Sequence, residues 1–324
     1  MRALILGGTG LVGRAAARRL LAAGWDVDVT GRDPSRCRAG NFLAVDRDDP
    51  AALRATLGEG ADLLVDCICF TAEDARGIVP LLSNVTSTVM ISSKAVYVDE
   101  HGNHSNSDVQ ARFDGPVHET QPTLPPGDMP YDSRDGYGPN KVAAEQVLLD
   151  TGAPVTILRP SKIHGEGSMP PREWIYVKRV LDERPVCFFA HRGEGVDHPT
   201  AAVNIAALIE TAAAKPGARI LNSADPDAPN ALEISRAIAR YLGHTWEEVL
   251  VEDDSLGQHP WDKRPPVILD TTASHELGYQ PVGNYAATVV EEVDWLVNER
   301  PALDDGLFGS YLDYGAEDRF LDNR

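Results

Sequence analysis

Short apolar runs alternate with amphipathic segments along the first half of the chain. The apolar runs are four to six residues long and cover residues 3–6, 27–30, 63–68, 88–91 and 155–158. Near-continuous apolar runs of this length are typical of parallel β-strands that are covered on both faces. Helices are predicted between them at residues 13–23, 50–57 and 137–149. The alternation predicts right-handed βαβ units, and therefore an α/β fold with a doubly wound parallel sheet.

Residues 99–135 break this regularity. The segment is rich in polar residues and proline and has no helical or strand period. We predict one long loop here, either a lid or binding loop or a solvated excursion. Beyond residue 160, Pro and Gly separate the predicted elements. These are helices at 173–183, 201–214, 231–242 and 286–297, strands at 186–189 and 219–222, and an acidic, aromatic tail at 304–324 to which the pattern assigns no role.

The net charge of the chain restricts the classes of partner that it is expected to bind. The 324 residues include 49 Asp and Glu against 30 Lys and Arg, which gives a formal net charge of −19. Such a charge repels polyanions, so neither nucleic acid nor an acidic membrane surface is expected as a main partner. No stretch approaches the ~18 apolar residues that span a bilayer, and the first apolar run is too short for a signal-peptide core. We expect a cytoplasmic location.

The four cysteines do not form a metal or disulfide pattern. They show neither a paired CxxC spacing nor neighbouring histidines in a ligand arrangement. We therefore expect reduced thiols and no metal site. Cys67 and Cys69 alternate on an apolar run, where small buried side chains are the simplest interpretation.

A glycine-rich motif, GGTGLVG, occupies residues 7–13 directly after the first predicted strand. Glycine is needed where a chain turns tightly and where a pyrophosphate approaches the backbone. The helix that follows adds N–H groups and the positive end of its dipole. Because a second strand is predicted from residue 27, this context indicates a dinucleotide-binding site rather than a structural turn. Its predicted contacts are Gly7, Thr9, Gly10, Leu11, Val12 and Gly13.

The end of the second strand bears on the choice between NAD and NADP. An acidic residue at this point binds the ribose 2′-hydroxyl in NAD sites, whereas an arginine accommodates a 2′-phosphate. This chain has Arg32 followed by Asp33, and Arg14 lies in the first turn of the preceding helix. We expect NADP, with NAD as the alternative if Asp33 reaches the ribose. Asp46 is predicted either to bind the adenine amine or to cap a turn.

Two further segments suggest acid–base chemistry. Ser92 and Ser93 end a predicted strand, and Tyr137 and Lys141 lie four residues apart on a predicted helix, where they share one face. A phenol is a poor base at neutral pH, and a nearby ammonium together with a nicotinamide cation would favour its ionised form. Tyr137 is therefore the candidate proton shuttle. Ser93 is the candidate hydrogen-bond donor to the oxygen of a carbinol or carbonyl.

Together these segments resemble an extended short-chain dehydrogenase/reductase of the NAD-dependent epimerase/dehydratase family. The resemblance rests on GGTGLVG at 7–13, SSKAVY at 92–97, YGPNK at 137–141, RPSKIHGEG at 159–167 and LGYQP at 277–281. It implies that Ser93, Tyr137 and Lys141 are catalytic and that Lys141 also binds the nicotinamide ribose. Further implied contacts are Pro160 and Ile163 with the cofactor, and Lys94, Ser161, Lys162 and His164 with the substrate.

The resemblance also implies a domain arrangement. A Rossmann domain is expected at residues 1–164, with returning elements near 196–225. A smaller C-terminal α/β substrate lobe is expected from residues 165–195 and 226–324. The exposed faces of two long helices often build a homodimer in this family, and the oligomeric state of this chain is left open.

The chain departs from the family pattern where substrates bind. The 4,6-dehydratases have acidic residues directly after the catalytic hydroxyl, whereas this chain has Lys94 and Ala95, which disfavours sugar dehydration. Lys162 and His164 replace the Asn and Tyr of the common RPxNVYGPG segment, and residues 195–199, GVDHP, lack the usual arginine. The charge that binds a diphosphate would then come from Lys162, Arg172 or Arg192.

We expect an NAD(P)-dependent enzyme that oxidises a secondary alcohol of a sugar or nucleotide-sugar-like substrate and returns the hydride, which gives epimerisation. One alternative is an NADPH-dependent ketoreductase or dehydrogenase with net redox change. Another is a non-catalytic dinucleotide-sensing or RNA-binding protein on the same scaffold. The intact set of Ser93, Tyr137 and Lys141 argues against a sensor, and the net charge argues against RNA.

Overall fold

The computed structural model describes residues 1–300 and 308–323, so the first part of the predicted tail at 304–324 lies outside the described residues. The chain divides into two compact units. Unit 1 comprises Met1–Ser161, Ala202–Ala224 and Leu269–Val282. Unit 2 comprises Lys162–Ala201, Asp225–Ile268 and Gly283–Arg324. Each unit has its own hydrophobic core.

Within the described residues, unit 1 is built on a parallel sheet of seven strands in the order β10-β6-β5-β4-β1-β2-β3. The strands are β1 (Arg2–Leu6), β2 (Asp26–Gly31), β3 (Asn41–Ala44), β4 (Ala61–Asp66), β5 (Val85–Ile91), β6 (Val155–Pro160) and β10 (Arg219–Ser223). This confirms the predicted α/β fold with a doubly wound sheet. The strand order reverses between β1 and β4, and open parallel sheets bind ligands beyond the carboxyl ends of the strands at such a point.

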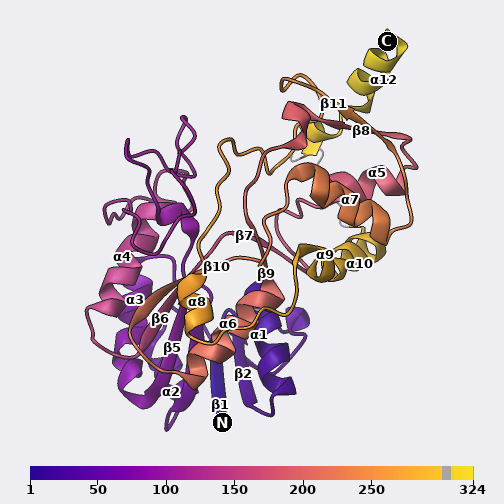
Figure 1. The fold of residues 1–324 in the computed structure, drawn as a ribbon. Helices are drawn as coiled ribbons and strands as arrows, with labels where there is room; N and C mark the ends of the chain where they lie inside the picture. The colour runs from indigo at the N-terminus through magenta and orange to yellow at the C-terminus, as the bar shows by residue number, and fades with distance from the viewer. Residues whose placement is uncertain (301–307, 324) are drawn as a thin grey trace. The chain divides into compact units, whose positions relative to one another are not determined.

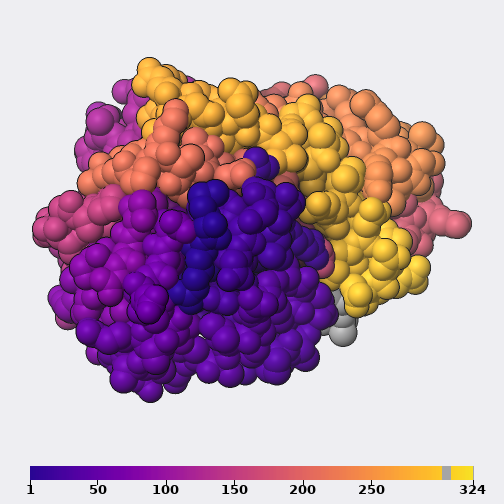
Figure 2. Space-filling model, turned by 90° about the horizontal axis from the view of Figure 1, so that it is seen from below, coloured from indigo at the N-terminus to yellow at the C-terminus, as the bar shows by residue number. Residues whose placement is uncertain are grey.

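Helices cover both faces of this sheet (Figure 1). On one face α1 (Leu11–Ala22) packs against α6 (Ala202–Ala214). On the other face α3 (Ala72–Ile78) packs against α4 (Tyr137–Leu149) and α2 (Pro50–Leu57). Figure 2 shows the salmon atoms of the returning segment 202–224 next to the indigo and purple atoms of the first part of the chain. Among the described residues, no helix has the length and apolar character that crossing a membrane requires.

Local sequence explains where several helices begin. The Asp49 carboxylate accepts hydrogen bonds from the backbone N–H groups of Ala51 and Ala52, and Pro50 takes the first helical position of α2. The bounds of α4 agree with the prediction. Helix α3 was not predicted from the sequence, although Thr71 and Asp74 form a capping box at its start.

Residues 99–135 contain no helix or strand in the structure, as predicted. Their start is organised by Asp99, whose carboxylate accepts hydrogen bonds from the backbone N–H groups of His101, Asn103 and Arg112 and from the Asn103 amide. Burial acts in the opposite direction, but these donors outweigh it and lower the pKa of Asp99 to about 2. One ionised carboxylate therefore fixes the conformation of the start of this loop.

Unit 2 combines short parallel strand pairs with a helical core. β7 (Lys162–His164) pairs with β9 (Pro199–Ala201), and β8 (Val186–Phe189) pairs with β11 (Glu247–Leu250). Its helices are α5 (Trp174–Leu181), α7 (Ala231–Tyr241), α9 (Tyr285–Thr288), α10 (Val290–Glu299) and α12 (Tyr314–Asp322). The core is aromatic, with the rings of Tyr176 and Trp261 stacked 5.8 Å apart. The single helix predicted at 286–297 is wrong, because the structure has two helices there, α9 and α10.

The last part of the chain is held to unit 2 by buried charges. Arg179 Nη2 lies 2.6 Å from Glu317 Oε1, and the two side chains are 2% and 3% exposed. The ring of Tyr314 lies 5.3 Å from the guanidinium of Arg179 and 4.4 Å from that of Arg184. Glu317 and Tyr314, an acidic and an aromatic residue of the predicted tail, thus anchor α12.

Candidate active site

The glycine motif forms a tight turn between β1 and α1. Gly7 has a φ of +75°, a left-handed conformation that favours glycine, and its carbonyl accepts a hydrogen bond from the N–H of Gly10 at 3.0 Å. A Cβ atom at Gly13 would lie 2.5 Å from the Gly7 oxygen. Helix α1 can therefore pack this closely on the turn only because residue 13 has no side chain.

Gly10 has a different environment. A Cβ atom there would make a tight contact of 3.3 Å with the Gly7 oxygen and would meet no other heavy atom of the described residues within 4 Å, so packing restricts this position less than it restricts Gly13. Gly10 is the N-cap of α1 and supplies no side-chain cap for the N–H groups of the first turn. A partly exposed helix start without a side-chain cap fits a pyrophosphate, which needs N–H donors and close approach to the backbone.

Arg32 and Asp33 follow β2 and have different surroundings. The Asp33 carboxylate accepts hydrogen bonds from the hydroxyl of Ser35 at 2.7 Å and from its backbone N–H at 2.9 Å, and these bonds lower the pKa of Asp33. Arg32 is exposed beyond the strand end. Asp46 accepts a hydrogen bond from the Asp48 N–H at 3.1 Å, which is the capping arrangement considered in the sequence analysis.

The two serines after β5 have different environments. The Ser93 hydroxyl accepts a hydrogen bond from the Ala95 N–H at 3.1 Å, as the cap of a short 3₁₀ turn at Lys94–Val96. This bond uses a lone pair of the oxygen, so the hydroxyl hydrogen can still be donated. Ser93 and Lys94 are partly exposed, whereas Ser92 is buried.

Helix α4 brings Tyr137 and Lys141 to the same region. A Cβ atom at Gly138 would lie 2.9 Å from the Ala95 oxygen, so glycine allows the start of α4 to pack against the turn that Ser93 caps. The Lys141 ammonium donates to the carbonyl oxygens of Cys69 at 2.8 Å and Ile91 at 2.9 Å, beyond β4 and at the end of β5. It is 5.9 Å from the centre of the Tyr137 ring. A positive charge is thereby held beside a phenol at the carboxyl edge of the sheet.

A comparison with protein families agrees with this geometry. The model of the NAD dependent epimerase/dehydratase family matches residues 3–193, which is more than half of the chain. The chain belongs to this family. It is therefore an enzyme of an NAD-dependent family, as the sequence motifs suggested. The alternative of a non-catalytic sensor or RNA-binding protein is not supported.

Individual relatives of this chain are distant. A probable dTDP-4,6-dihydroxy-2-methyloxan-3-one 4-ketoreductase from Streptomyces antibioticus is 29% identical over 174 residues, which are 51% of this chain and 52% of that protein. The match therefore spans about half the length of this curated relative.

Solved structures match over more of the chain. The UDP-N-acetylglucosamine 4-epimerase from Bacillus cereus superposes with a TM-score of 0.71 at 17% identity, covering 92% of this chain and 99% of that one. The UDP-glucose 4-epimerase of Thermus thermophilus, in complex with NAD, has a TM-score of 0.65 at 18% identity and covers 94% and 100% of the two chains. At such low identities the structures establish the fold of this family member.

A buried polar network around Glu145 was not predicted from the sequence. The Ser92 hydroxyl donates to Glu145, which also pairs with Arg159: Nε lies 3.0 Å from Oε1, and Nη2 lies 2.5 Å from Oε2. The side chains of Arg159 and Glu145 are 4% and 3% exposed. Burial opposes the charge of Arg159, but its bonds to Glu145 outweigh that effect and raise its pKa. The available signal was Glu145 itself, four residues after Lys141 on the buried face of α4.

The predicted cofactor and substrate contacts that follow Arg159 in the sequence belong to both units. Pro160 and Ser161 belong to unit 1, whereas Lys162, Ile163 and His164 form β7 of unit 2. Lys162 Nζ lies 2.8 Å from Asp197 Oδ2 and donates to the Pro260 carbonyl at 2.6 Å.

His164 is only 2% exposed, and its Nε2 lies 2.9 Å from an Asp225 carboxylate oxygen. Burial acts against the charged form of the imidazole. The hydrogen bond and charge of Asp225 outweigh burial and raise the pKa of His164. A buried and paired ring does not favour a substrate contact, so that role of His164 stays a prediction.

Proposed function

We propose that this enzyme transfers hydride at a secondary alcohol carbon of a sugar or nucleotide-sugar-like substrate, with net epimerisation. The observation that carries the proposal is the position of the Lys141 ammonium. It is 2% exposed, bound to the carbonyls of Cys69 and Ile91, and 5.9 Å from the Tyr137 ring. When bound, a nicotinamide cofactor supplies the hydride acceptor and donor for this chemistry.

The proposed roles follow from charge and position. Tyr137 accepts the proton of the substrate hydroxyl and later returns it, because the Lys141 ammonium stabilises the negative charge that develops on the phenolic oxygen. Lys141 keeps its place because two carbonyls hold it. Ser93 donates its hydroxyl hydrogen to the reacting oxygen of the substrate. This hydrogen bond orients the carbinol carbon.

The cofactor is proposed to lie along the first βα turn. Its pyrophosphate would accept hydrogen bonds from the first turn of α1, where Gly10 leaves the backbone uncovered. Thr9, Leu11 and Val12 are the neighbouring proposed contacts. Lys141, Pro160 and Ile163 are proposed to contact the nicotinamide end.

We propose NADP as the preferred cofactor. Asp33 is engaged by both donors of Ser35, so it is less suited to bind a ribose 2′-hydroxyl. Arg32 is exposed at the strand end and offers a guanidinium for a 2′-phosphate. The NAD bound to the Thermus thermophilus epimerase shows that this fold also accepts the other dinucleotide, which makes NAD the alternative.

A second candidate function is an NADPH-dependent ketoreductase. It is favoured by the Streptomyces antibioticus relative, which is named a probable 4-ketoreductase, and by the proposed use of NADP. An epimerase keeps its cofactor and shows no net absorbance change at about 340 nm, whereas a reductase consumes NADPH stoichiometrically.

Unit 2 is proposed to bind the substrate. The relatives act on UDP- and dTDP-linked sugars according to their names, so a nucleotide diphosphate sugar is the substrate class to test first. Lys162, Ser161 and Lys94 are the proposed contacts with it. Lys94 and Ala95 after the catalytic serine continue to argue against dehydration. Cytoplasmic location stays a prediction.

The test combines a substrate panel with matched tyrosine variants. UDP-glucose, UDP-N-acetylglucosamine and a dTDP-4-keto-6-deoxy sugar are incubated with NADP(H) and NAD(H), with absorbance at about 340 nm and product chromatography as readouts. With an active substrate, Tyr137→Phe should lower kcat by roughly 10²- to 10⁴-fold. Tyr241→Phe, at an exposed tyrosine of α7, should not change it. Undiminished activity of Tyr137→Phe would refute the mechanism.

A further inference from the structure

Three buried ionisable side chains of unit 2 meet at a point that the proposed reaction does not use. His164 ends β7, Glu173 directly precedes α5 and Glu292 lies in α10. They are 2%, 3% and 0% exposed. One ring nitrogen of His164 and one carboxylate oxygen of each glutamate lie within 4.8 Å of one another. Over residues 1–300 and 308–323, no other three His, Cys, Asp or Glu residues form such a group.

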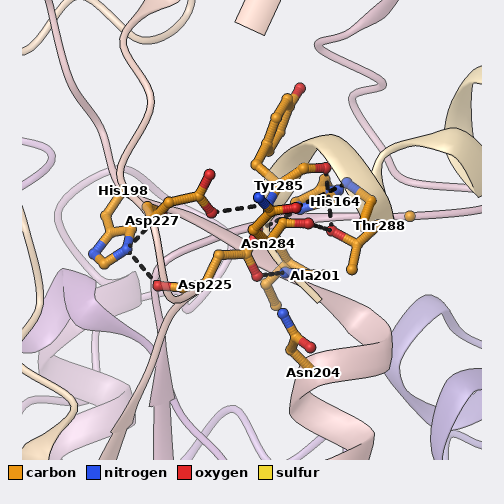
Figure 3. A network of polar contacts seen from close by, with 12 residues as sticks. His164, His198, Ala201, Asn204, Asp225, Asp227, Asn284, Tyr285 and Thr288 are labelled. Atoms are coloured by element: carbon orange, nitrogen blue, oxygen red, sulfur yellow. Dashed lines mark hydrogen bonds and ion pairs between the residues drawn. The ribbon is translucent and has the colours of Figure 1, made fainter. Parts of the chain in front are cut away.

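The orientation of His164 points to a ligand. Its Nε2 is taken by Asp225 Oδ2 at 2.9 Å, and the other oxygen of Asp225 accepts a hydrogen bond from the Ala201 N–H at 2.7 Å. Figure 3 shows Asp225 held between Ala201 and the ring of His198. Nδ1 of His164 is buried and has no hydrogen-bond partner among the described residues. Histidines that bind metals present one nitrogen to the ion and the other to a carboxylate in this manner.

The two buried glutamates receive their hydrogen bonds from neutral groups. Glu292 accepts hydrogen bonds from the Gly165 N–H at 2.6 Å and from the Ser168 hydroxyl. The Tyr285 hydroxyl donates to Glu173 at 3.2 Å. All of these donors are neutral, and no Lys or Arg of the described residues forms an ion pair with either carboxylate. Buried carboxylates are stable when they are paired or coordinate a metal.

We propose that His164 Nδ1, Glu173 and Glu292 bind one divalent cation, for which Zn²⁺ is the best match. An imidazole with two carboxylates is a zinc donor set, whereas Mg²⁺ and Ca²⁺ prefer oxygen ligands throughout. Bonds of about 2.0–2.2 Å to a tetrahedral ion place ligand atoms roughly 3.3–3.6 Å apart. From the observed limit of 4.8 Å, the side chains need to close by no more than about 1.5 Å.

Such an ion would have a structural role in unit 2. It would connect β7, the start of α5 and α10, which the sequence separates by 9 and 119 residues (173 − 164 and 292 − 173). Asp225 would act as a positioning residue that holds the imidazole. The proposal does not depend on the reaction proposed above, because the proposed hydride and proton transfers use none of these side chains.

The direct test is titration of the full, untagged chain with ZnCl₂ after removal of metals with EDTA, with MgCl₂ as the contrasting ion. Isothermal titration calorimetry at pH 7.5 should give one Zn²⁺ per chain, no comparable binding of Mg²⁺, and a higher unfolding temperature with Zn²⁺. Anomalous diffraction at the zinc edge should place the ion between the three side chains. A chain that binds no Zn²⁺, or binds it elsewhere, overturns the proposal.

Variants separate this site from surface binding. Glu292→Gln keeps the size and an acceptor oxygen but should lower Zn²⁺ affinity at least tenfold, and Asp225→Asn should lower it by about 10- to 100-fold. The matched control is Glu291→Gln, one residue earlier on the exposed side of α10, which should bind as the natural chain does. Circular dichroism checks that each variant is folded, and Glu173→Gln replaces any that is not. Equal affinity of Glu292→Gln and the natural chain would overturn the proposal.

Discussion

Removal of the Glu145 carboxylate is the most informative perturbation of unit 1. Glu145 forms two hydrogen bonds with Arg159, at 3.0 and 2.5 Å, and accepts a third from Ser92. In Glu145→Ala, Arg159 stays charged at a place where its side chain is only 4% exposed. Breaking a buried ion pair in this way costs about 3–5 kcal/mol. At about 2–4 °C per kcal/mol, the unfolding temperature should fall by about 6–20 °C.

Unit 1 offers a matched control. Arg19 Nε and Glu210 Oε2, on α1 and α6, are 2.6 Å apart, but their side chains are 37% and 30% exposed. An exposed pair contributes about 0–1 kcal/mol, so Glu210→Ala should lower the unfolding temperature by no more than about 4 °C. Both substitutions place alanine in a helix, so differences in helix propensity cancel. Thermal unfolding followed by circular dichroism measures both shifts.

The double variant Glu145→Leu with Arg159→Met tests the cause. It removes both charges and fills the space with apolar atoms, so much of the lost stability should return. If Glu145→Ala and Glu210→Ala shift the transition by the same small amount, burial does not govern the strength of these pairs and the reasoning is refuted. A double variant that is less stable than Glu145→Ala would show that the buried charge is not the cause.

Three further predictions follow from single contacts. Arg32→Ala should raise the KM for NADPH roughly 10- to 150-fold, because a hydrogen bond to a charged group contributes about 1.5–3 kcal/mol. The KM for NADH should not change. Equal effects on the KM values of both cofactors contradict 2′-phosphate binding by Arg32. Gly13→Ala should cost about 1–3 kcal/mol of stability because its Cβ would lie 2.5 Å from the Gly7 oxygen, whereas Gly77→Ala, with open space around it, should be neutral or stabilising in the same thermal assay. Because the pKa of Asp99 is lowered to about 2 by its donors, its contribution to stability is present above about pH 4 and is lost as the pH falls towards 2. Asp99→Asn should therefore be less stable than the natural chain at pH 7, and the difference should disappear as the pH falls through 2; a difference that does not change with pH contradicts the role of the charge.

The fold and part of the candidate site follow from local patterns. Strand-length apolar runs reveal parallel strands because both faces must be covered. Asp49 with Pro50 marks the start of α2 because an N-cap acts within one turn. The glycine motif can be recognised from the sequence because the structural requirements for glycine at Gly7 and Gly13, a left-handed turn and close helix packing, arise within seven residues. The short helix α3 was missed, since seven residues give too little periodicity.

What the sequence by itself determined is the alternation of strands and helices in the first half of the chain, the glycine turn, and the candidate residues Ser93, Tyr137 and Lys141, because each of these is marked by its neighbours along the chain. Only the tertiary structure decided which charges are buried and what they meet. Glu145 reaches Ser92 across 53 positions, and His164 meets Glu292 across 128 (292 − 164). Contacts at such separations depend on how whole elements pack, and a local pattern contains no record of that packing.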